Sequence, residues 1–297
     1  AEIAARIDMN TDLVTEDFGL SSAPPAVQQM CDLKTTYDVS LPSLAALCVN
    51  LLFLGGGQTT ERAIQRLRTI CEEAVASVMM KYESACAFAM QRGLLPEAEK
   101  LRGTPRVLLL SELEAMAAAK NDDFPAWKTA QAQLLREKIE QGELTLQNAS
   151  IQYIQRVLEC SGEEEPMVVI GIAPPYYPAV CNAYLPADGS DIAEKVRAVV
   201  EGSYHMRLSV IPYFTGIGDG SYMTCIAPAQ ERALLTNLMS LPASIYDIPF
   251  ESAARLNAPV FYLGPRCRAI HQWCERVYLP DLVEIVPHII DHILGLR

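Results

Sequence analysis

The stretch that most restricts the fold is Met167–Ala173, with the sequence Met-Val-Val-Ile-Gly-Ile-Ala and no polar side chain. An apolar run of this length is typical of a strand that is buried on both faces, and such strands occur mainly in parallel sheets covered by helices. A charged turn at 163–166 precedes the run, and a proline-rich segment at 174–178 follows it. The sequence therefore predicts an α/β fold with a mostly parallel sheet and helices on both faces.

Other parts of the chain alternate between helical spacing of apolar residues and short apolar runs. Helical spacing predicts helices over residues 2–9, 59–93, 111–120, 125–160 with a break at Gly142, 191–201, 229–239, 249–257 and 281–295. Apolar runs predict strands over residues 38–54, 106–110, 167–173, 207–214 and 259–263. Pro42 makes the first of these an edge or bulged strand, because proline donates no hydrogen bond to a neighbouring strand.

The order of these elements predicts two domains. Strand, helix, strand and the start of a helix over 38–120 form a small α+β module, whereas the rest alternates as in a parallel α/β domain. With 297 residues, half of them hydrophobic, the chain can bury one large core or two ordinary ones. We therefore predict domains at 1–120 and 121–297. The chain opens in helical rhythm without methionine, so it is expected to begin within a domain.

Charge and cysteine usage restrict the class of partner. The net charge of -12 argues against nucleic acid and anionic membranes, which need a basic face, and favours a small-molecule or protein partner. Nine cysteines without a CxxC pair predict a reduced, cytoplasmic setting. The longest apolar run, 44–54, is shorter than the roughly twenty residues that span a bilayer, and we expect no signal peptide or transmembrane segment.

Three loops are predicted to meet at one edge of the sheet. They follow the strand ends at Ile172, Ile211 and Leu263, and ligands of open α/β sheets bind beyond the carboxyl ends of strands. The third loop begins at Gly264 and carries His271, the foremost candidate for a functional role. A lone loop histidine more commonly faces solvent or makes a local hydrogen bond, so that interpretation stays open.

Segments at these loops carry a family resemblance. They are Ile172-Ala173-Pro174-Pro175-Tyr176-Tyr177-Pro178, Phe214-Thr215-Gly216-Ile217-Gly218-Asp219-Gly220-Ser221-Tyr222 and Gly264–Tyr278, joined earlier in the chain by Pro24-Pro25, Asp32-Leu33-Lys34 and Tyr37-Asp38-Val39. Together, and in order over essentially the whole chain, they resemble the RocB-type arginine-utilisation proteins. These form a branch of the zinc-dependent aminoacylase and carboxypeptidase superfamily, which also holds acetylornithine deacetylase and succinyl-diaminopimelate desuccinylase.

The resemblance implies a fold and an activity. The family has a catalytic α/β domain interrupted by a ferredoxin-like lid that often dimerises, and this chain would be its C-terminal part. Residues 1–120 would be the lid without its first strand, and 121–297 the returning half of the catalytic domain. The implied activity is metal-dependent hydrolysis of an amide bond in an N-acyl amino acid or small peptide-like substrate, in arginine or amino-acid degradation.

The resemblance also implies residue roles. The family binds two zinc ions, with manganese or cobalt as alternatives, and its last histidine ligand falls on His271. The first histidine, the bridging aspartate and the general base would lie upstream of Ala1, so this chain alone is expected to lack hydrolase activity and to need the upstream part of the same polypeptide. The substrate pocket would be lined by Gly218, Asp219, Tyr176, Tyr177 and Gly264.

Several residues keep an alternative interpretation. Glu275 can support His271 as a carboxylate behind a metal ligand, or pair with Arg276 or Arg268. Asp219 can be a turn residue that binds its own backbone. His288 and His292 have a spacing that can bind zinc, but a solvated or capping role is favoured.

The function also keeps an alternative, a non-catalytic homologue acting in oligomerisation or partner binding. Residues 48–52 lack the arginine that many relatives use to hold the substrate carboxylate, which leaves the substrate open. A serine hydrolase is disfavoured because no Gly-x-Ser-x-Gly motif occurs. No second histidine is placed to activate Cys267 or Cys274 as a nucleophile.

Overall fold

The computed structural model describes residues 1–34, 39, 41–55, 59–94, 105–185, 190–214 and 218–296. The chain divides into two compact units. Unit 1 is Ala1–Tyr176 with Ala227–Ile248, and unit 2 is Tyr177–Ile226 with Pro249–Arg297. The predicted division near residue 120 into a lid and a catalytic part stays a prediction.

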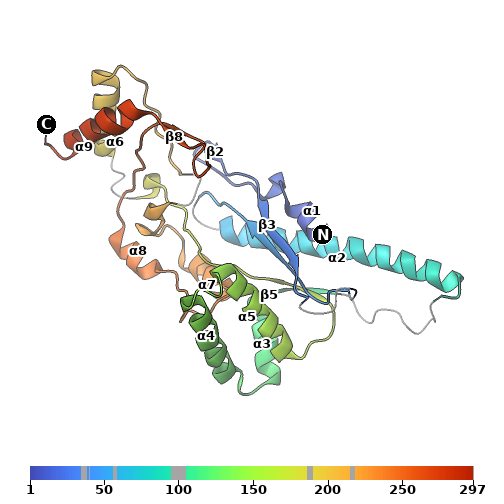
Figure 1. Ribbon diagram of the computed structural model, residues 1–297. Helices are drawn as coiled ribbons and strands as arrows, with labels where there is room; N and C mark the ends of the chain where they lie inside the picture. Colours follow the sequence, from blue (N-terminus) through green and yellow to red (C-terminus); the bar gives the residue numbers. More distant parts are fainter. Residues whose placement is uncertain are drawn as a thin grey trace. The chain divides into compact units, whose positions relative to one another are not determined.

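An antiparallel strand pair and a long helix form the first part of unit 1 (Figure 1). Strand β3 (Ala26–Asp32) pairs with β4 (Ala45–Asn50), and the register shifts between Val27 and Gln29. Leu47 and Val49 of β4 pack with Ile64 and Ile70 of helix α2 (Thr59–Gln91). The predicted strand 38–54 is therefore confirmed at its centre, while its residues Asp38 and Ser40, and Tyr37 of the Tyr37-Asp38-Val39 motif, lie outside the described residues.

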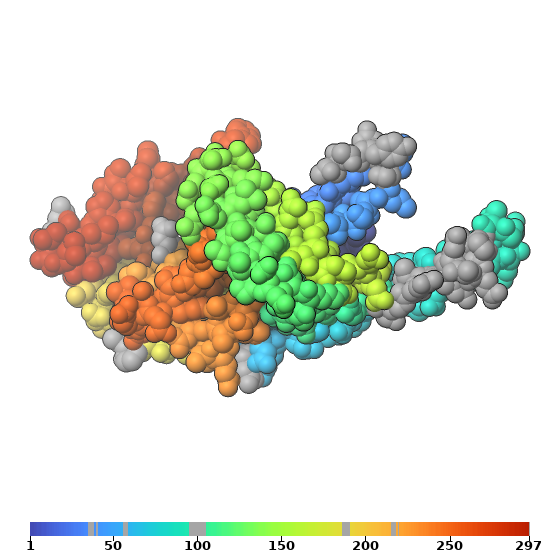
Figure 2. Space-filling view, turned by 90° about the horizontal axis from the view of Figure 1, so that it is seen from below, coloured from blue at the N-terminus to red at the C-terminus, as the bar shows by residue number. Residues whose placement is uncertain are grey.

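The other elements near the N-terminus are short. They are α1 (Glu2–Ile7), the 3-10 helix η1 (Thr11–Leu13) and the paired strands β1 (Glu16–Asp17) and β2 (Leu20–Ser21). Helix α2 is the predicted helix 59–93, and its apolar side chains divide it in two. Those up to Ala74 enter the core, whereas Val78, Met80 and Phe88 are exposed on the part that Figure 2 shows at the surface.

A parallel strand pair covered by helices forms the second part of unit 1. Strand β5 (Arg106–Leu109) pairs in parallel with β6 (Met167–Ile170). The helices here are α3 (Leu110–Lys120), α4 (Phe124–Glu140) and α5 (Leu146–Ser161). A bridge between Ile172 and Met239 continues the parallel pairing. This mixture of helices and small sheets is compatible with the predicted α/β class, but the parallel sheet has only these two named strands in the described part of the chain.

A charged network inside this helical layer holds α4 to its neighbours. Leu113 and Val157 are fully buried in the core between α3 and α5. The buried Tyr153 hydroxyl donates to the Glu114 carboxylate, and Lys128 Nζ lies 2.8 Å from both Glu114 oxygens. Burial and the hydrogen bond to Glu114 raise the pKa of Tyr153, so the phenol stays protonated and donates.

Helix α7 (Ala229–Leu238) returns to unit 1 and contacts the start of α2. Glu231 in its first turn accepts hydrogen bonds from the Thr60 hydroxyl and the Thr60 backbone N–H. Its other oxygen, Oε2, is buried without a hydrogen-bond partner. Burial raises the pKa of Glu231, while the bonds from Thr60 oppose that shift. The carboxylate therefore caps α2 from another helix.

Unit 2 contains short helices and one small hairpin. Its elements are η2 (Asn182–Tyr184), α6 (Ser190–Arg197), η3 (Ala198–Ser203), η4 (Asp219–Tyr222), α8 (Phe250–Leu256), β7 (Cys267–Arg268), β8 (Arg276–Val277), η5 (Asp281–Ile285) and α9 (Val286–Ile293). Its hydrophobic core joins Val196, Val199 and Val200 to Ile285 and Ile289. The predicted helices at 191–201, 249–257 and 281–295 are thus confirmed within two residues at each end.

The predictions of strands at 207–214 and 259–263 are wrong, because neither segment pairs with another strand among the residues that the structure describes. At Val260 a side chain takes the place of a neighbouring strand. The Val260 N–H donates to Asn182 Oδ1 at 2.9 Å, and Asn182 Nδ2 donates to the Val260 carbonyl at 3.0 Å. A side-chain amide offers the same donor and acceptor as a peptide group, so it satisfies this backbone without a sheet.

The helices and cysteines of the described residues bear on the predicted cellular location. None of the described helices combines the length and the apolar composition needed to cross a membrane. None of the nine cysteines, all of which lie in the described part of the chain, forms a disulfide, as expected from their irregular spacing. A cytoplasmic location stays a prediction.

Candidate functional site

The glycine loop of unit 2 lies against the predicted strand 259–263. The Gly220 N–H donates to Tyr262 Oη at 2.7 Å. A Cβ atom at Gly218 would lie 2.2 Å from Tyr262 Oη, and one at Gly220 would lie 2.4 Å from Val260 Cγ1. Neither position has room for a side chain, so both glycines are required by close approach. Residues 215–217 of the predicted loop lie outside the described residues.

Aromatic rings extend this cluster. The ring of Phe214 stacks on Tyr262 with centroids 4.7 Å apart, and Tyr177 approaches Tyr222 with centroids 5.8 Å apart. Asp219 begins the 3-10 helix η4, and Ser221 in the same turn is buried. Within unit 2, the structure therefore brings the Gly218–Tyr222 loop together with Tyr177 and the 260–262 segment.

The two neighbouring tyrosines of the predicted pocket belong to different units. The Tyr176 N–H donates to Tyr246 Oη at 2.8 Å, and the Tyr246 hydroxyl donates to the Tyr176 carbonyl at 3.1 Å. Tyr176 and Tyr246 are in unit 1, whereas Tyr177 begins unit 2. The proline-rich sequence around Tyr176 is thus the first of three points at which the chain passes from one unit to the other.

His271 lies in the loop of the hairpin formed by β7 and β8. Its backbone has φ of +61°, and its side chain is exposed. Its N–H donates to Glu275 Oε2 at 2.9 Å. Glu275 therefore positions His271 through the backbone, which leaves the imidazole free of this carboxylate. Gly264, before the hairpin, is exposed, and a Cβ there would meet nothing within 4 Å.

The side chains around His271 supply fewer ligands than a metal ion needs. An exposed neutral imidazole can supply one ligand, and a zinc ion in a protein takes three or four. Among the described residues, no group of three or more His, Cys, Asp and Glu side chains is arranged to hold a metal ion. His271 fits the role of one ligand, but the described residues do not complete a metal site.

The base of the hairpin is fixed by an ion pair that the sequence interpretation missed. Arg266 Nε and its backbone N–H contact Asp281 Oδ2 at 2.7 Å and 2.8 Å, and Arg266 Nη2 contacts Oδ1 at 2.9 Å. The guanidinium also lies 4.4 Å from the ring centroid of Tyr278. Hydrogen bonding to Arg266 lowers the pKa of Asp281. The signal in the sequence was Pro280-Asp281, an acidic residue at the start of the last helical segment.

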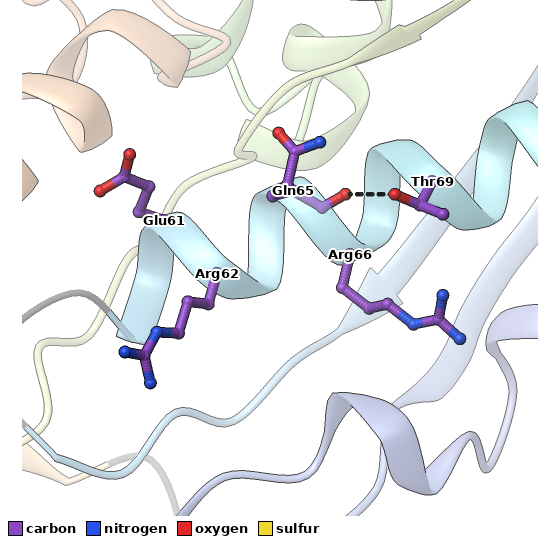
Figure 3. A pocket seen from close by; sticks show the side chains of 5 residues that line it. All are labelled: Glu61, Arg62, Gln65, Arg66 and Thr69. Carbon is purple, nitrogen blue, oxygen red and sulfur yellow. Dashed lines mark hydrogen bonds between the residues drawn. The ribbon is translucent and has the colours of Figure 1, made fainter.

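A hollow on α2 has none of the predicted residues in its lining. Its volume is about 460 Å³, and it is lined by Glu61, Arg62, Gln65, Arg66 and Thr69. Figure 3 shows the two arginines extending from one side of the helix and Glu61 and Gln65 from the other. Arg66 Nη2 forms an ion pair with Asp12 Oδ2 at 2.5 Å. The side chains do not converge on a common point, so this hollow is not the candidate site.

Comparison with known proteins adds a relationship. Curated proteins similar to this chain include the uncharacterized protein YqjN of Bacillus subtilis (strain 168), 24% identical over 296 residues. Protein RocB of the same organism is 23% identical over 304 residues. Each alignment covers 98% of this chain, but only 51% of YqjN and 50% of RocB. The chain therefore spans about half the length of the curated relatives it matches.

This weak similarity over nearly the whole chain supports a RocB-like relationship. No protein-family model matches the chain. No solved structure matches it either.

Proposed function

We propose that this chain is part of a metal-dependent amidohydrolase that cleaves N-acyl amino acids or small peptide-like substrates in arginine or amino-acid degradation. The observation that carries the proposal is the similarity to RocB along 98% of the chain. The similarity supports a function related to arginine utilisation. The hydrolytic chemistry comes from the resemblance of the His271 and Gly218–Tyr222 segments to the zinc-dependent family.

His271 would be one terminal metal ligand. Its imidazole is exposed, and Glu275 fixes the backbone that carries it. The other ligands and the general base would come from the part of the relatives' length that this chain does not span. When bound, a pair of metal ions supplies a water of lowered pKa and polarises the scissile carbonyl.

The Gly218–Tyr222 loop would form a wall of the substrate pocket, with Tyr177 beside it. Its two glycines let the backbone lie directly on Tyr262, and such close approach gives a wall of fixed shape. Asp219 and Gly264 stay candidates for this pocket on the resemblance alone, and so does Tyr176. A homodimer formed through residues 1–120 is proposed on the same ground.

The test compares two proteins, this 297-residue chain and a longer protein that contains it and reaches the length of its relatives. Both are assayed with N-acetyl amino acids and dipeptides after addition of Zn²⁺, Mn²⁺ or Co²⁺. We expect turnover only from the longer protein. In that protein His271→Asn should lower kcat/KM by at least about 100-fold, because loss of a ligand weakens the site more than loss of its supporting groups.

His205→Asn is the matched control for His271→Asn. Both histidines are exposed and have positive φ, +55° at His205 and +61° at His271, a conformation that asparagine tolerates. We expect His205→Asn to leave turnover unchanged. Hydrolysis by the 297-residue chain alone, or equal rates for the two variants, would contradict the proposal. Absence of hydrolysis in the longer protein with every metal would favour a non-catalytic homologue that acts in partner binding.

A further inference from the structure

Two arginines face each other across the β7–β8 hairpin. The register pairs Arg268 directly with Arg276, and Cys267 with Val277. Directly opposed residues of an antiparallel pair point to the same face, with Cβ atoms about 4.5–5.5 Å apart. Like charges in this position destabilise a hairpin unless something of opposite charge lies between them.

A third arginine on the same face, Arg266, has a partner of opposite charge. Arg266 lies two residues before Arg268, so the alternation of a strand places it on the same face. Asp281 holds Arg266 through three hydrogen bonds, and Tyr278 covers its guanidinium. Arg268 and Arg276 have no comparable partner, since neither makes an ion pair with any residue that the structure describes.

The surroundings of this arginine pair suit a small anionic ligand. Both side chains are exposed and present two positive charges on a chain whose net charge is -12. The loop between them carries His271 and also Trp273, whose side chain is 99% exposed. A guanidinium presents its N–H groups in a planar fork that matches the two oxygens of a carboxylate.

We propose that Arg268 and Arg276 form a clamp that binds the carboxylate of a small-molecule ligand next to His271. The identification of that ligand as an N-acyl amino acid rests on the proposed function. The clamp supplies a cationic group that is absent from residues 48–52, where the sequence offers no arginine. A bound carboxylate would also remove the repulsion between the two guanidinium groups.

The experiment uses the full 297-residue chain and reads binding by the fluorescence of Trp273. The probes are N-acetyl-L-alanine, its uncharged amide N-acetyl-L-alaninamide, and inorganic phosphate. We expect saturable binding of N-acetyl-L-alanine, none of the amide, and competition by phosphate, because guanidinium groups bind both carboxylate and phosphate in a bidentate way but have no anionic group to bind in the amide. Binding should weaken as NaCl is added, since salt screens exposed charges. Trp273→Phe identifies the part of the signal that comes from the hairpin, because Trp127 is the other tryptophan.

Variants then assign the binding to the clamp. Arg268→Gln and Arg276→Gln should each weaken N-acetyl-L-alanine binding by about tenfold, the loss expected for one charge-assisted hydrogen-bonding group. Arg255→Gln, which changes an exposed arginine on α8 in the same unit, should leave binding unchanged. Equal binding of the amide, no competition by phosphate, or equal loss in all three variants would overturn the proposal.

The clamp and the hydrolase proposal fail in different ways. If the longer protein lacks hydrolase activity but the chain still binds N-acetyl-L-alanine through Arg268 and Arg276, the proposed function fails and the clamp stands. If the longer protein hydrolyses N-acetyl amino acids and Arg268→Gln leaves KM unchanged, the clamp fails and the proposed function stands.

Discussion

Different kinds of interaction stabilise the interior of each of the two compact units. Unit 1 has a core of helix side chains, such as Leu113 and Val157, beside a half-buried charged network in which Glu114 contacts Lys128 and the buried Tyr153. Around the candidate pocket, unit 2 relies on single contacts between a side chain and the backbone, such as Asn182 on Val260 and Tyr262 on Gly220. The difference teaches that unit 1 should lose stability through cavities, whereas this part of unit 2 should lose it through individual bonds and clashes.

The largest effect is expected in the core of unit 1. Leu113→Ala removes a fully buried side chain on α3 and should lower the free energy of unfolding by about 2–5 kcal/mol, because a cavity remains. Urea unfolding followed by the fluorescence of Trp127, which packs on the same core, measures this loss. Leu134→Ala on α4, where the side chain is 44% exposed, is the control and should cost less than about 1 kcal/mol. Equal losses would show that this core does not carry the stability of unit 1.

A clash in unit 2 should come next. Gly218→Ala forces a methyl group against Tyr262 Oη and should cost about 1–3 kcal/mol, as is usual when a tightly packed site is overfilled. Hydrogen exchange of the Gly220 amide, which is bonded to Tyr262, should accelerate. Gly264→Ala serves as the control, because a Cβ there meets nothing and should change neither quantity. Unchanged exchange of the Gly220 amide in Gly218→Ala would show that close contact with Tyr262 does not stabilise this loop.

The carboxylate cap of α2 should give unit 1 a dependence on pH. The pKa of Glu231 is raised in the folded protein from 4.5, so the stability linked to its protonation is full below about that pH and is lost as pH rises through the folded value. Glu231→Gln keeps an acceptor for Thr60 and carries no charge. The variant should therefore be more stable than the wild type at pH 7.5, by less than about 1 kcal/mol, and equally stable near pH 4. Thermal unfolding at both pH values tests this, and a variant that is less stable at pH 7.5 would contradict it.

The smallest effect is expected at the hairpin of unit 2. Arg276→Glu places opposite charges across the strands and should stabilise the hairpin by about 0.2–1 kcal/mol. It should also abolish binding of N-acetyl-L-alanine, so stability and binding change in opposite directions. Hydrogen exchange at the Tyr278 amide, which donates to the Arg266 carbonyl at the base of the hairpin, measures the first effect. Faster exchange in the variant would contradict the assignment of repulsion to this pair.

The difference between the two units also explains which helices and strands could be predicted from the sequence. Helices α2, α4 and α5 follow from the period of their apolar residues, and β6 follows from a continuous apolar run. Strand β3 was missed because its side chains are mostly exposed, which leaves no apolar pattern to detect. In unit 2 the segments 207–214 and 259–263 have the composition of strands, but composition does not reveal whether a partner strand is present.

The candidate site was predictable only in part. The paired glycines of the Gly218–Tyr222 loop were visible in the sequence, and the structure supplies their reason, the close approach of Tyr262. The link from His271 to Glu275 was anticipated, but it runs through the backbone N–H and not the imidazole. The opposed arginines could not be anticipated, because their register depends on where the hairpin turns, and no pattern in 264–278 fixes that turn.

The most direct test of the central claim, that His271 is a ligand of a hydrolytic metal site, is the metal content of the longer protein. Elemental analysis would be made on the purified wild type and on His271→Asn, with His205→Asn as the control. The account predicts about two metal ions per chain in the wild type and in His205→Asn, and a clear loss in His271→Asn. Equal metal content in all three proteins would contradict it.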